Sequence, residues 1–347
     1  MNSKRAADRG LQVGTLERGS LNKISDVPGV SVGHATIRDA RHNTGVTVVM
    51  PCEDNMFRSR LTAASFVLNG FGKTQGLIQV EELGTLETPI ALTNTLNVGI
   101  VHDALVEYMV ARCARERVPV HSLNPVVGEC NDSQLNTIED RAVTREHVLQ
   151  AIADCRSDFD EGDVGAGTGT ICHGLKGGIG SASRVMSIAG QRYTLGVLVQ
   201  SNHGCLSELT VCGRRLGEEI IRRRKQAPAP APMDRGSIMM IVATDLPVSD
   251  RQLRRIIKRC SVGLARCGSY FGHGSGDVMI GFSTANRVPN GGMARVLTRH
   301  ELTEEALETA FFAVAEATQE AVLNSLCCAD DVHAPDGRVI EGIGRYL

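Results

Sequence analysis

The order of apolar and polar residues along the chain predicts both strands and helices. Short apolar or alternating runs predict strands at residues 27–36, 45–50, 64–68, 191–200, 237–244 and 277–283. Apolar residues at helical spacing predict helices at residues 97–116, 140–155, 217–225, 250–267 and 303–326. The strands outnumber the parallel crossovers that a Rossmann fold would require. The mixture favours an α+β fold with four layers in the order αββα.

Composition indicates a soluble globular protein. The 347 residues could form one large domain or two medium ones, and 42% of them are apolar. A net charge of -2 and an aromatic content of 3% give no reason to expect a nucleic-acid partner. No run is long and apolar enough to span a membrane, and the polar N-terminus lacks the apolar core of a signal peptide. The eleven scattered cysteines therefore indicate reduced thiols in a cytoplasmic protein.

The bond between Gly236 and Ser237 is the most informative local feature. A Pro-Ala run at residues 227–232 precedes it, and the apolar run 238–242 follows it. An extended linker thus delivers a Gly-Ser bond to the mouth of a buried strand, which suits a chain that cuts itself. Cleavage would leave Ser237 with a hydroxyl nucleophile beside a free α-amine, whose pKa is about 7.7–8.0. The alternative is an ordinary interdomain linker followed by a strand.

Other polar side chains are suited to acyl chemistry. Ser275 and Asp277 lie two residues apart before a strand, so both point the same way and could relay a proton. Asn202 follows an apolar strand and could donate to a developing oxyanion, or satisfy its own turn. Glu129 lies in a polar segment and could accept a substrate ammonium group. The structural alternatives are a plain turn at 274–277 and a solvated glutamate at 129.

The glycine-rich segment 164–170 and the ten histidines do not indicate a cofactor. The segment lacks the glycine spacings of dinucleotide and P-loop sites, and predicts either a tight backbone passage near an active site or packing glycines. No histidines have metal-site spacing, and no Cys-x-x-Cys pair is present. We therefore expect no metal and no cofactor, and we expect activity to survive a chelator.

Eight ordered segments together point to a family. They include LTNTL at 92–96, KGGIG at 176–180 and GSGD at 274–277, and the others lie at 24–30, 69–73, 81–89, 167–174 and 236–245. Over almost its whole length the chain therefore resembles the L-aminopeptidase/D-esterase family, which includes the β-peptidyl aminopeptidases. Each motif is weak alone, and the specificity comes from their number and order.

The resemblance implies a self-processing hydrolase. The implied fold is an αββα sandwich like that of N-terminal nucleophile hydrolases, reached through a different chain connectivity. A single domain, residues 1–347, would cleave at Gly236-Ser237 into a larger fragment 1–236 and a smaller fragment 237–347 that stay associated. Family members form homo-oligomers, often tetramers. They release N-terminal residues from peptides, amides or esters, and some accept β-amino acids or D-residues.

The resemblance also implies roles for particular residues. Ser237 matches the nucleophile and Asn202 an oxyanion donor. Ser275 matches the second serine of the family, and Asp277 the acidic position two residues beyond it. In the implied mechanism, Ser237 Oγ first attacks its own preceding carbonyl and later attacks the first bond of the substrate. The base is either the Ser237 α-amine or the Ser275–Asp277 pair.

Two substrate-binding residues follow by the same route. Glu129 matches an acidic residue near the amino group of the substrate. Some relatives carry a tyrosine in the segment matching 130–136, where this chain has no aromatic residue, so Asn131 is the candidate polar group. Two alternative functions stay open at this point. One is an acyltransferase like the ornithine acetyltransferases, which use threonine, and the other is an unprocessed binding or assembly protein.

Overall fold

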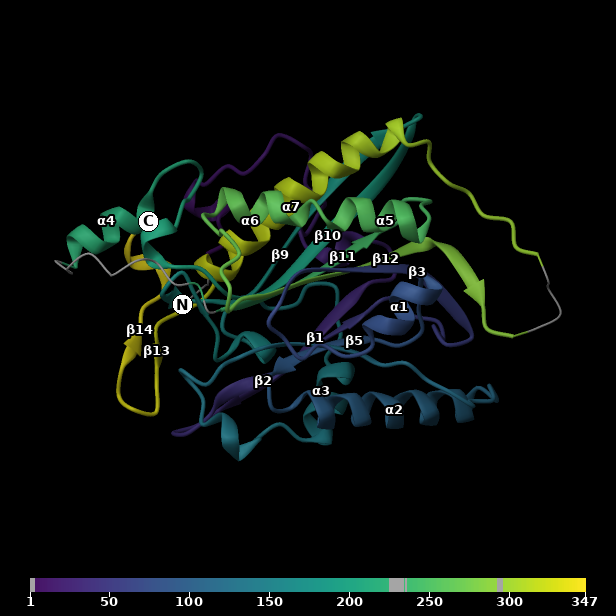
Figure 1. Cartoon of the computed structure of the whole chain (residues 1–347), viewed down its shortest axis with the longest axis horizontal. Coiled ribbons are helices and arrows are strands. Elements are labelled where there is room, and N and C mark those ends of the chain that lie inside the picture. The colour runs from purple at the N-terminus through teal and green to yellow at the C-terminus, as the bar shows by residue number, and fades with distance from the viewer. Residues whose placement is uncertain (1–3, 225–233, 235, 292–295) are drawn as a thin grey trace.

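The structure is a computed structural model that describes residues 4–224, 234, 236–291 and 296–347. The Pro-Ala run at 227–232, predicted to be a linker, lies outside the described residues. Two β-sheets lie face to face at the centre (Figure 1). The larger sheet has the order β4 (Thr85–Leu86), β3 (Ser59–Gly70), β12 (Gly276–Pro289), β11 (Ser237–Thr244), β10 (Gln191–Asn202) and β9 (Gly178–Ile188). The smaller sheet has the order β1 (Ser31–Arg38), β2 (Asn43–Met50), β5 (Ile90–Asn94) and β6 (Val126–Cys130).

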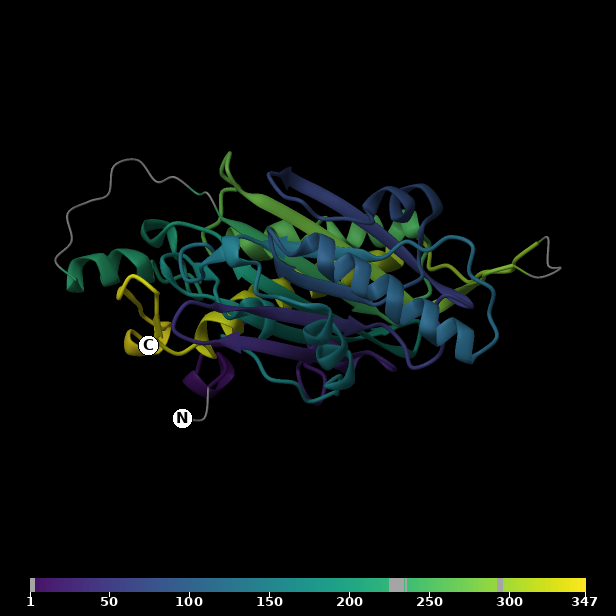
Figure 2. The same cartoon turned by 90° about the horizontal axis from the view of Figure 1, so that it is seen from below.

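Helices cover the outer face of each sheet. The larger sheet is covered by α5 (Asp250–Ile257), α6 (Cys260–Arg266) and α7 (Glu308–Cys327). The smaller sheet is covered by α2 (Val98–Arg115) and α3 (Arg145–Ala153), which lie nearest the viewer in Figure 2. Two short helices, α1 (Leu77–Leu83) and α4 (Leu216–Arg223), complete the main set. The predicted αββα order is therefore confirmed.

Strand β11 shows why one short run decides the centre of the fold. Ile238, Met240 and Val242 enter the core under the helices, whereas Met239, Ile241 and Ala243 enter the core between the sheets. Successive side chains of a strand point to opposite faces, so a strand buried on both faces must be apolar throughout. Ser237 lies two residues before Met239, so its side chain points to the same face of the strand, toward the smaller sheet.

Several predicted boundaries are wrong. The helix predicted at 250–267 is two helices, because the chain turns at Lys258-Arg259 so that the apolar faces of α5 and α6 both pack in one core. Val262, one of the apolar residues at helical spacing in that range, is 42% exposed. The helix predicted at 140–155 begins only at Arg145. Strand β9 was missed because two glycines open it, and a Cβ on Gly180 would lie 2.0 Å from a carbonyl oxygen of α7.

A buried ion network joins the larger sheet to α7. Arg184 on β9 contacts Glu316 at 2.9 Å and Glu320 at 2.8 Å, and all three side chains are buried. Arg184 also donates to the carbonyl oxygen of Val13, which ties in the N-terminal segment. Among the described residues Arg184 is the cation paired with Glu316, whereas Glu320 also pairs with Arg18 at 2.9 Å. In the described part of the chain, no helix is both long and apolar enough to cross a bilayer.

Candidate active site

Ser237 lies where three strands of the larger sheet meet. It is the first residue of β11, and its ladder partners are Asn202, the last residue of β10, and Gly276, the first residue of β12. The neighbouring strands fix it from both sides, and its side chain is nearly buried. From the smaller sheet, the Cys130 thiol donates to the Ser237 carbonyl oxygen at 3.5 Å. Ser237 therefore lies at the end of a central strand of the larger sheet, and groups far apart in the sequence hold it there.

The backbone amide of Gly276 contacts both groups that take part in the predicted cleavage, the Ser237 hydroxyl and the Gly236 carbonyl. It lies 3.3 Å from Ser237 Oγ and 3.2 Å from the carbonyl oxygen of Gly236. A Cβ on Gly276 would lie 2.5 Å from the Phe71 carbonyl oxygen and 3.1 Å from Ser237 Oγ. Glycine at this position therefore leaves room for the hydroxyl. A backbone N–H directed at a carbonyl oxygen is also the kind of donor that stabilises an oxyanion.

Gly236 is also tightly packed, against the end of β10 and against Asp234. A Cβ added to it would lie 2.0 Å from the Asn202 carbonyl oxygen and 2.5 Å from His203 Cα. Its N–H donates to Asp234 Oδ1 at 3.2 Å, and the same oxygen accepts the Gly204 N–H at 3.0 Å. The bond before Ser237 is thus a tightly packed part of the site rather than an open linker.

The Ser275–Asp277 pair is connected to Ser237 through Gly276, which lies between the two residues and pairs with Ser237. The two residues flank Gly276, and the Ser275 hydroxyl donates to Asp277 Oδ1 at 2.7 Å. Both side chains are fully buried, and Asp277 Oδ2 has no hydrogen-bond partner among the described residues. Burial raises the pKa of Asp277 to about 6, the hydrogen bond from Ser275 lowers it, and the negative charge of Asp234 adds to the rise. The carboxyl group therefore titrates close to neutrality, where a base is useful.

The Asn202 side chain is held in one orientation by backbone groups. Its Oδ1 accepts the Ile171 N–H at 2.9 Å, and its Nδ2 donates to the Asn131 carbonyl oxygen at 2.9 Å. An amide nitrogen carries two hydrogens, so the second remains available as an oxyanion donor. Asn131 takes part through its backbone, while its exposed side chain accepts the Ser133 N–H. This geometry does not direct the Asn131 side chain toward Ser237.

Glu129 lies on β6 and is buried rather than solvated. Its Oε1 accepts the Lys73 N–H at 2.8 Å, and its Oε2 accepts the hydroxyl of Thr95. The turn at 71–73 also adjoins Gly276, because the Phe71 N–H donates to the Ser275 carbonyl oxygen at 3.3 Å. One turn therefore joins the Glu129 carboxylate to the Ser275–Asp277 segment, which pairs with Ser237 through Gly276.

Asp234 is the residue that the sequence reasoning missed. Its carboxylate is buried, Oδ1 binds two backbone amides, and Oδ2 has no partner in the described part of the chain. The signal was present in the spacing, because an aspartate two residues before a glycine commonly accepts its backbone N–H. The preceding Pro-Ala run drew the interpretation toward a linker and away from this contact.

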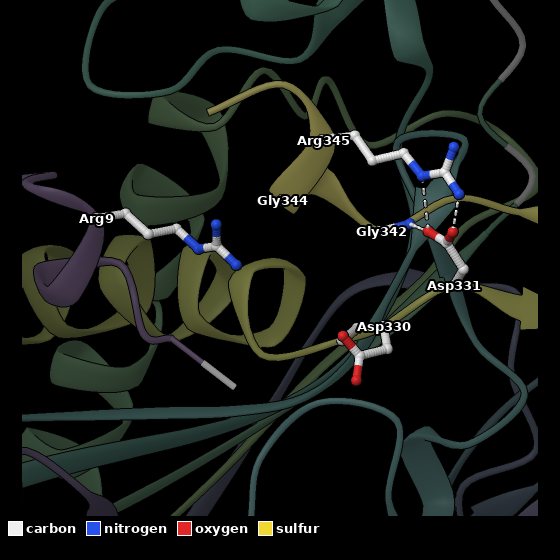
Figure 3. A pocket seen from close by; sticks show the side chains of 7 residues that line it. Arg9, Asp330, Asp331, Gly342, Gly344 and Arg345 are labelled. Carbon is white, nitrogen blue, oxygen red and sulfur yellow. Dashed lines mark hydrogen bonds and ion pairs between the residues drawn. The ribbon is translucent and has the colours of Figure 1, made fainter. Parts of the chain in front are cut away.

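A surface hollow of about 560 Å³ contains none of these residues (Figure 3). Arg9, Asp330, Asp331 and Arg345 line it. Asp331 is bound by the Arg345 guanidinium and by the Gly342 N–H at 2.8 Å, and Arg9 donates to the Cys327 carbonyl oxygen at 3.2 Å. None of the predicted site residues lines this hollow, so it lies apart from the groups suited to acyl chemistry.

Comparison with known proteins gives consistent relatives. Residues 22–340 match peptidase family S58. Beta-peptidyl aminopeptidase BapA of Sphingosinicella xenopeptidilytica is 36% identical over 344 residues, which cover 94% of this chain and 85% of that protein. The Burkholderia sp. beta-aminopeptidase structure is 39% identical with a TM-score of 0.90, covering 99% of this chain and 96% of that one.

A third relative connects the family to the fold. It is the L-aminopeptidase D-Ala-esterase/amidase of Ochrobactrum anthropi, whose structure is described as a prototype for the serine aminopeptidases and a new variant of the Ntn hydrolase fold. It is 35% identical with a TM-score of 0.90, and the match covers 98% of this chain and 95% of that one. The likeness therefore extends over the whole architecture and is not confined to the neighbourhood of Ser237.

Proposed function

The chain belongs to peptidase family S58 and is a serine aminopeptidase, and from that premise we propose that Ser237 is its nucleophile, released by self-cleavage after Gly236. One observation carries the proposal. The Gly276 N–H reaches both the Ser237 hydroxyl and the Gly236 carbonyl, at 3.3 and 3.2 Å. The attacking and the attacked groups are therefore held side by side, with a donor ready for the charge that develops.

Self-cleavage proceeds as an N-to-O acyl shift followed by hydrolysis. Ser237 Oγ bonds to the Gly236 carbonyl carbon and transfers its proton to the Ser275–Asp277 pair. The C–N bond breaks and the leaving nitrogen takes up that proton, which gives an ester and a free α-amine. Water then cleaves the ester, leaving a Gly236 carboxylate and a free Ser237 hydroxyl.

The Ser275–Asp277 pair is the base that we propose for both stages. Before cleavage the nitrogen of Ser237 is an amide, which has no basic lone pair, so the α-amine cannot act in the first cut. The carboxylate is present before and after cleavage, and the 2.7 Å hydrogen bond directs the Ser275 lone pairs away from Asp277. One relay therefore serves maturation and turnover, whereas the amine could serve only turnover.

In the mature enzyme the same steps act on a substrate. Ser237 Oγ attacks the carbonyl carbon of the first residue, and the free N–H of Asn202 stabilises the oxyanion. The leaving amine or alcohol takes the proton, and water hydrolyses the acyl-enzyme. The Glu129 carboxylate binds the substrate's ammonium group, which restricts the reaction to N-terminal residues. We include β-amino acid residues among the substrates, because two relatives carry beta-aminopeptidase names.

The two fragments, 1–236 and 237–347, would stay together after the cut. Strands β11 and β12 belong to the smaller fragment, yet they lie between β10 and β3 of the larger one. Eight ladder pairs join β11 to β10, so separation would break the centre of a sheet. We propose homo-oligomers of such processed pairs, probed by their mass in solution. A cytoplasmic location is supported by the eleven cysteines, none of which forms a disulfide.

Intact mass spectrometry of the purified protein tests the proposal. We expect two fragments that meet at the bond between Gly236 and Ser237, and one uncut 37.2 kDa chain without activity for Ser237→Ala. Ser187→Ala is the matched control, because Ser187 is exposed on β9 and should leave cleavage and turnover unchanged. An uncut wild-type chain that hydrolyses an N-terminal amide at full rate would refute self-cleavage. Adding free amine as an acyl acceptor separates hydrolysis from acyl transfer.

A further inference from the structure

Three potential metal ligands lie together near the Gly236-Ser237 bond, because His203 packs against Gly236. They are Cys172 and His173 on the hairpin of β7 (Ile171–Cys172) and β8 (Leu175–Lys176), and His203, which directly follows β10. Their donor atoms all lie within 4.8 Å of one another, and all three side chains are buried. The proposed cleavage mechanism uses none of them.

The distances suit a single ion. Zinc bonds thiolate sulfur at about 2.3 Å and imidazole nitrogen at about 2.0–2.1 Å, so bond angles of about 109–120° separate the two donors by about 3.5–3.8 Å. The observed separation of Cys172 Sγ from His203 Nδ1 is 3.8 Å. The rings of His173 and His203 meet edge to face with centroids 5.2 Å apart. Small side-chain movements would bring a ring nitrogen of His173 to bonding distance from the same ion.

The surroundings of His173 resemble those of a metal ligand. Its Nδ1 lies 3.0 Å from the Cys205 carbonyl oxygen, which can only accept, so the proton is on Nδ1 and Nε2 carries a lone pair. Metal-binding histidines usually make such a bond from the other ring nitrogen. His173 Nε2 is buried without a hydrogen-bond partner in the part of the chain that the structure describes, and His203 would bind through Nδ1, which lies nearest Cys172 Sγ.

The backbone is shaped to hold this arrangement. His173 has a φ of 49°, an unfavourable conformation for a residue with a side chain, and opens the two-residue turn of the hairpin with Gly174 at 69°. A Cβ on Gly204 would lie 2.4 Å from the His173 ring, so glycine leaves the space that the ring occupies. Strain of this kind persists only where the surroundings compensate for it.

We propose that Cys172, His173 and His203 bind one thiophilic metal ion, zinc(II), as a structural site. Binding replaces the thiol proton of Cys172, which is released to solvent, and forms one Zn–S and two Zn–N bonds, and a water molecule fills the fourth position of the tetrahedron. The ion joins the hairpin to the end of β10. Ile171 of that hairpin orients the Asn202 side chain, and Gly236 packs on His203, so the ion braces the site without entering the reaction. The proposal does not depend on the role of Ser237.

Metal content measured on the full chain tests this site. Wild type and variants are produced with zinc, dialysed, and assayed for zinc per chain by elemental analysis. We expect about one zinc per chain in wild type and a fall of about tenfold or more in Cys172→Ser and His203→Gln. Cys212→Ser is the matched control, because Cys212 is exposed and should keep the full content. Thermal unfolding should show that zinc raises Tm in wild type and not in Cys172→Ser.

Cobalt(II) supplies an independent measurement if a variant fails to fold. Added to zinc-free wild type, it should produce the thiolate-to-cobalt charge-transfer band and tetrahedral d–d bands, which zinc then removes. Equal zinc content in wild type and a folded Cys172→Ser variant would overturn the proposal. Absence of the thiolate band in wild type would do the same. Both outcomes leave self-cleavage untouched, because fragment masses are measured separately.

Discussion

The pH dependence of activity in the processed enzyme separates the two bases that the sequence left open. If the Ser275–Asp277 pair accepts the proton of Ser237, activity requires an ionised carboxylate. Burial raises the pKa of Asp277 to about 6, so kcat/KM should fall as the pH drops through about 6. If the α-amine of Ser237 were the base, the fall would lie at about 7.7–8.0 instead.

The size of the effect follows from the titration curve. With a pKa of about 6, only about one tenth of the Asp277 carboxyl groups are ionised at pH 5, against more than about nine tenths for a carboxyl of ordinary pKa. We therefore expect kcat/KM at about pH 5 to be about one tenth of its value at about pH 7.5. Asp277→Asn removes the base, and general-base contributions of about 10²–10⁴-fold set the expected loss.

As the pH rises, the free energy of unfolding should fall while the activity rises. Because the folded-state pKa of Asp277 is raised, its contribution to stability is fully present below about pH 3.8 and is lost as the pH rises through about 6. A rise from 3.8 to about 6 corresponds to about 3 kcal/mol at neutral pH. Asp277→Asn should therefore unfold at a higher Tm than wild type at pH 7, while the two converge at low pH.

The assay is steady-state hydrolysis of an amino-acid anilide by the processed wild-type enzyme at pH values from about 4.5 to 8.5. Asp132→Asn is the matched control, because burial also raises the pKa of Asp132 to about 6, whereas this carboxylate binds Thr44 and Asn136 rather than Ser275. The assignment to Asp277 would be refuted if kcat/KM of the wild type fell near pH 8 instead. It would also be refuted if the fall near pH 6 disappeared in Asp132→Asn alone.

Three further changes test the packing around the site and the core. Gly236→Ala should leave the chain uncut by intact mass, because its Cβ would lie 2.0 Å from the Asn202 carbonyl oxygen, and normal processing would contradict this. Asp234→Ala leaves two backbone amides without their acceptor and should slow cleavage by about tenfold or more in a mass time course. Asp234→Asn keeps an acceptor and should cleave faster than Asp234→Ala. Arg184→Met leaves the buried Glu316 carboxylate without its cation, while Glu320 keeps Arg18 at 2.9 Å, and should cost about 3–5 kcal/mol in denaturant unfolding, whereas Arg192→Met, on the surface, should have little effect.

The sequence located the parts of the site better than their contacts. Ser275 and Asp277 were predicted to point the same way, and the structure joins them by a hydrogen bond. Glu129 was predicted in a polar loop, yet it is a buried strand residue, because its polar neighbours in sequence are not its neighbours in space. Asp234 was missed for the same reason, since its second partner, Gly204, comes from the turn after β10.

Local order alone therefore determined that the Gly236-Ser237 bond lies at the start of a strand buried on both faces. A run that is apolar at every position must be buried on both faces, and a Gly-Ser bond just before it is placed at the end of a strand whatever the rest of the chain does. The tertiary structure alone decided what surrounds that bond. The pairing of β11 with β10 and β12, the thiol–imidazole cluster below, and the burial that raises the pKa of Asp277 depend on contacts between distant segments, which no short stretch of residues encodes.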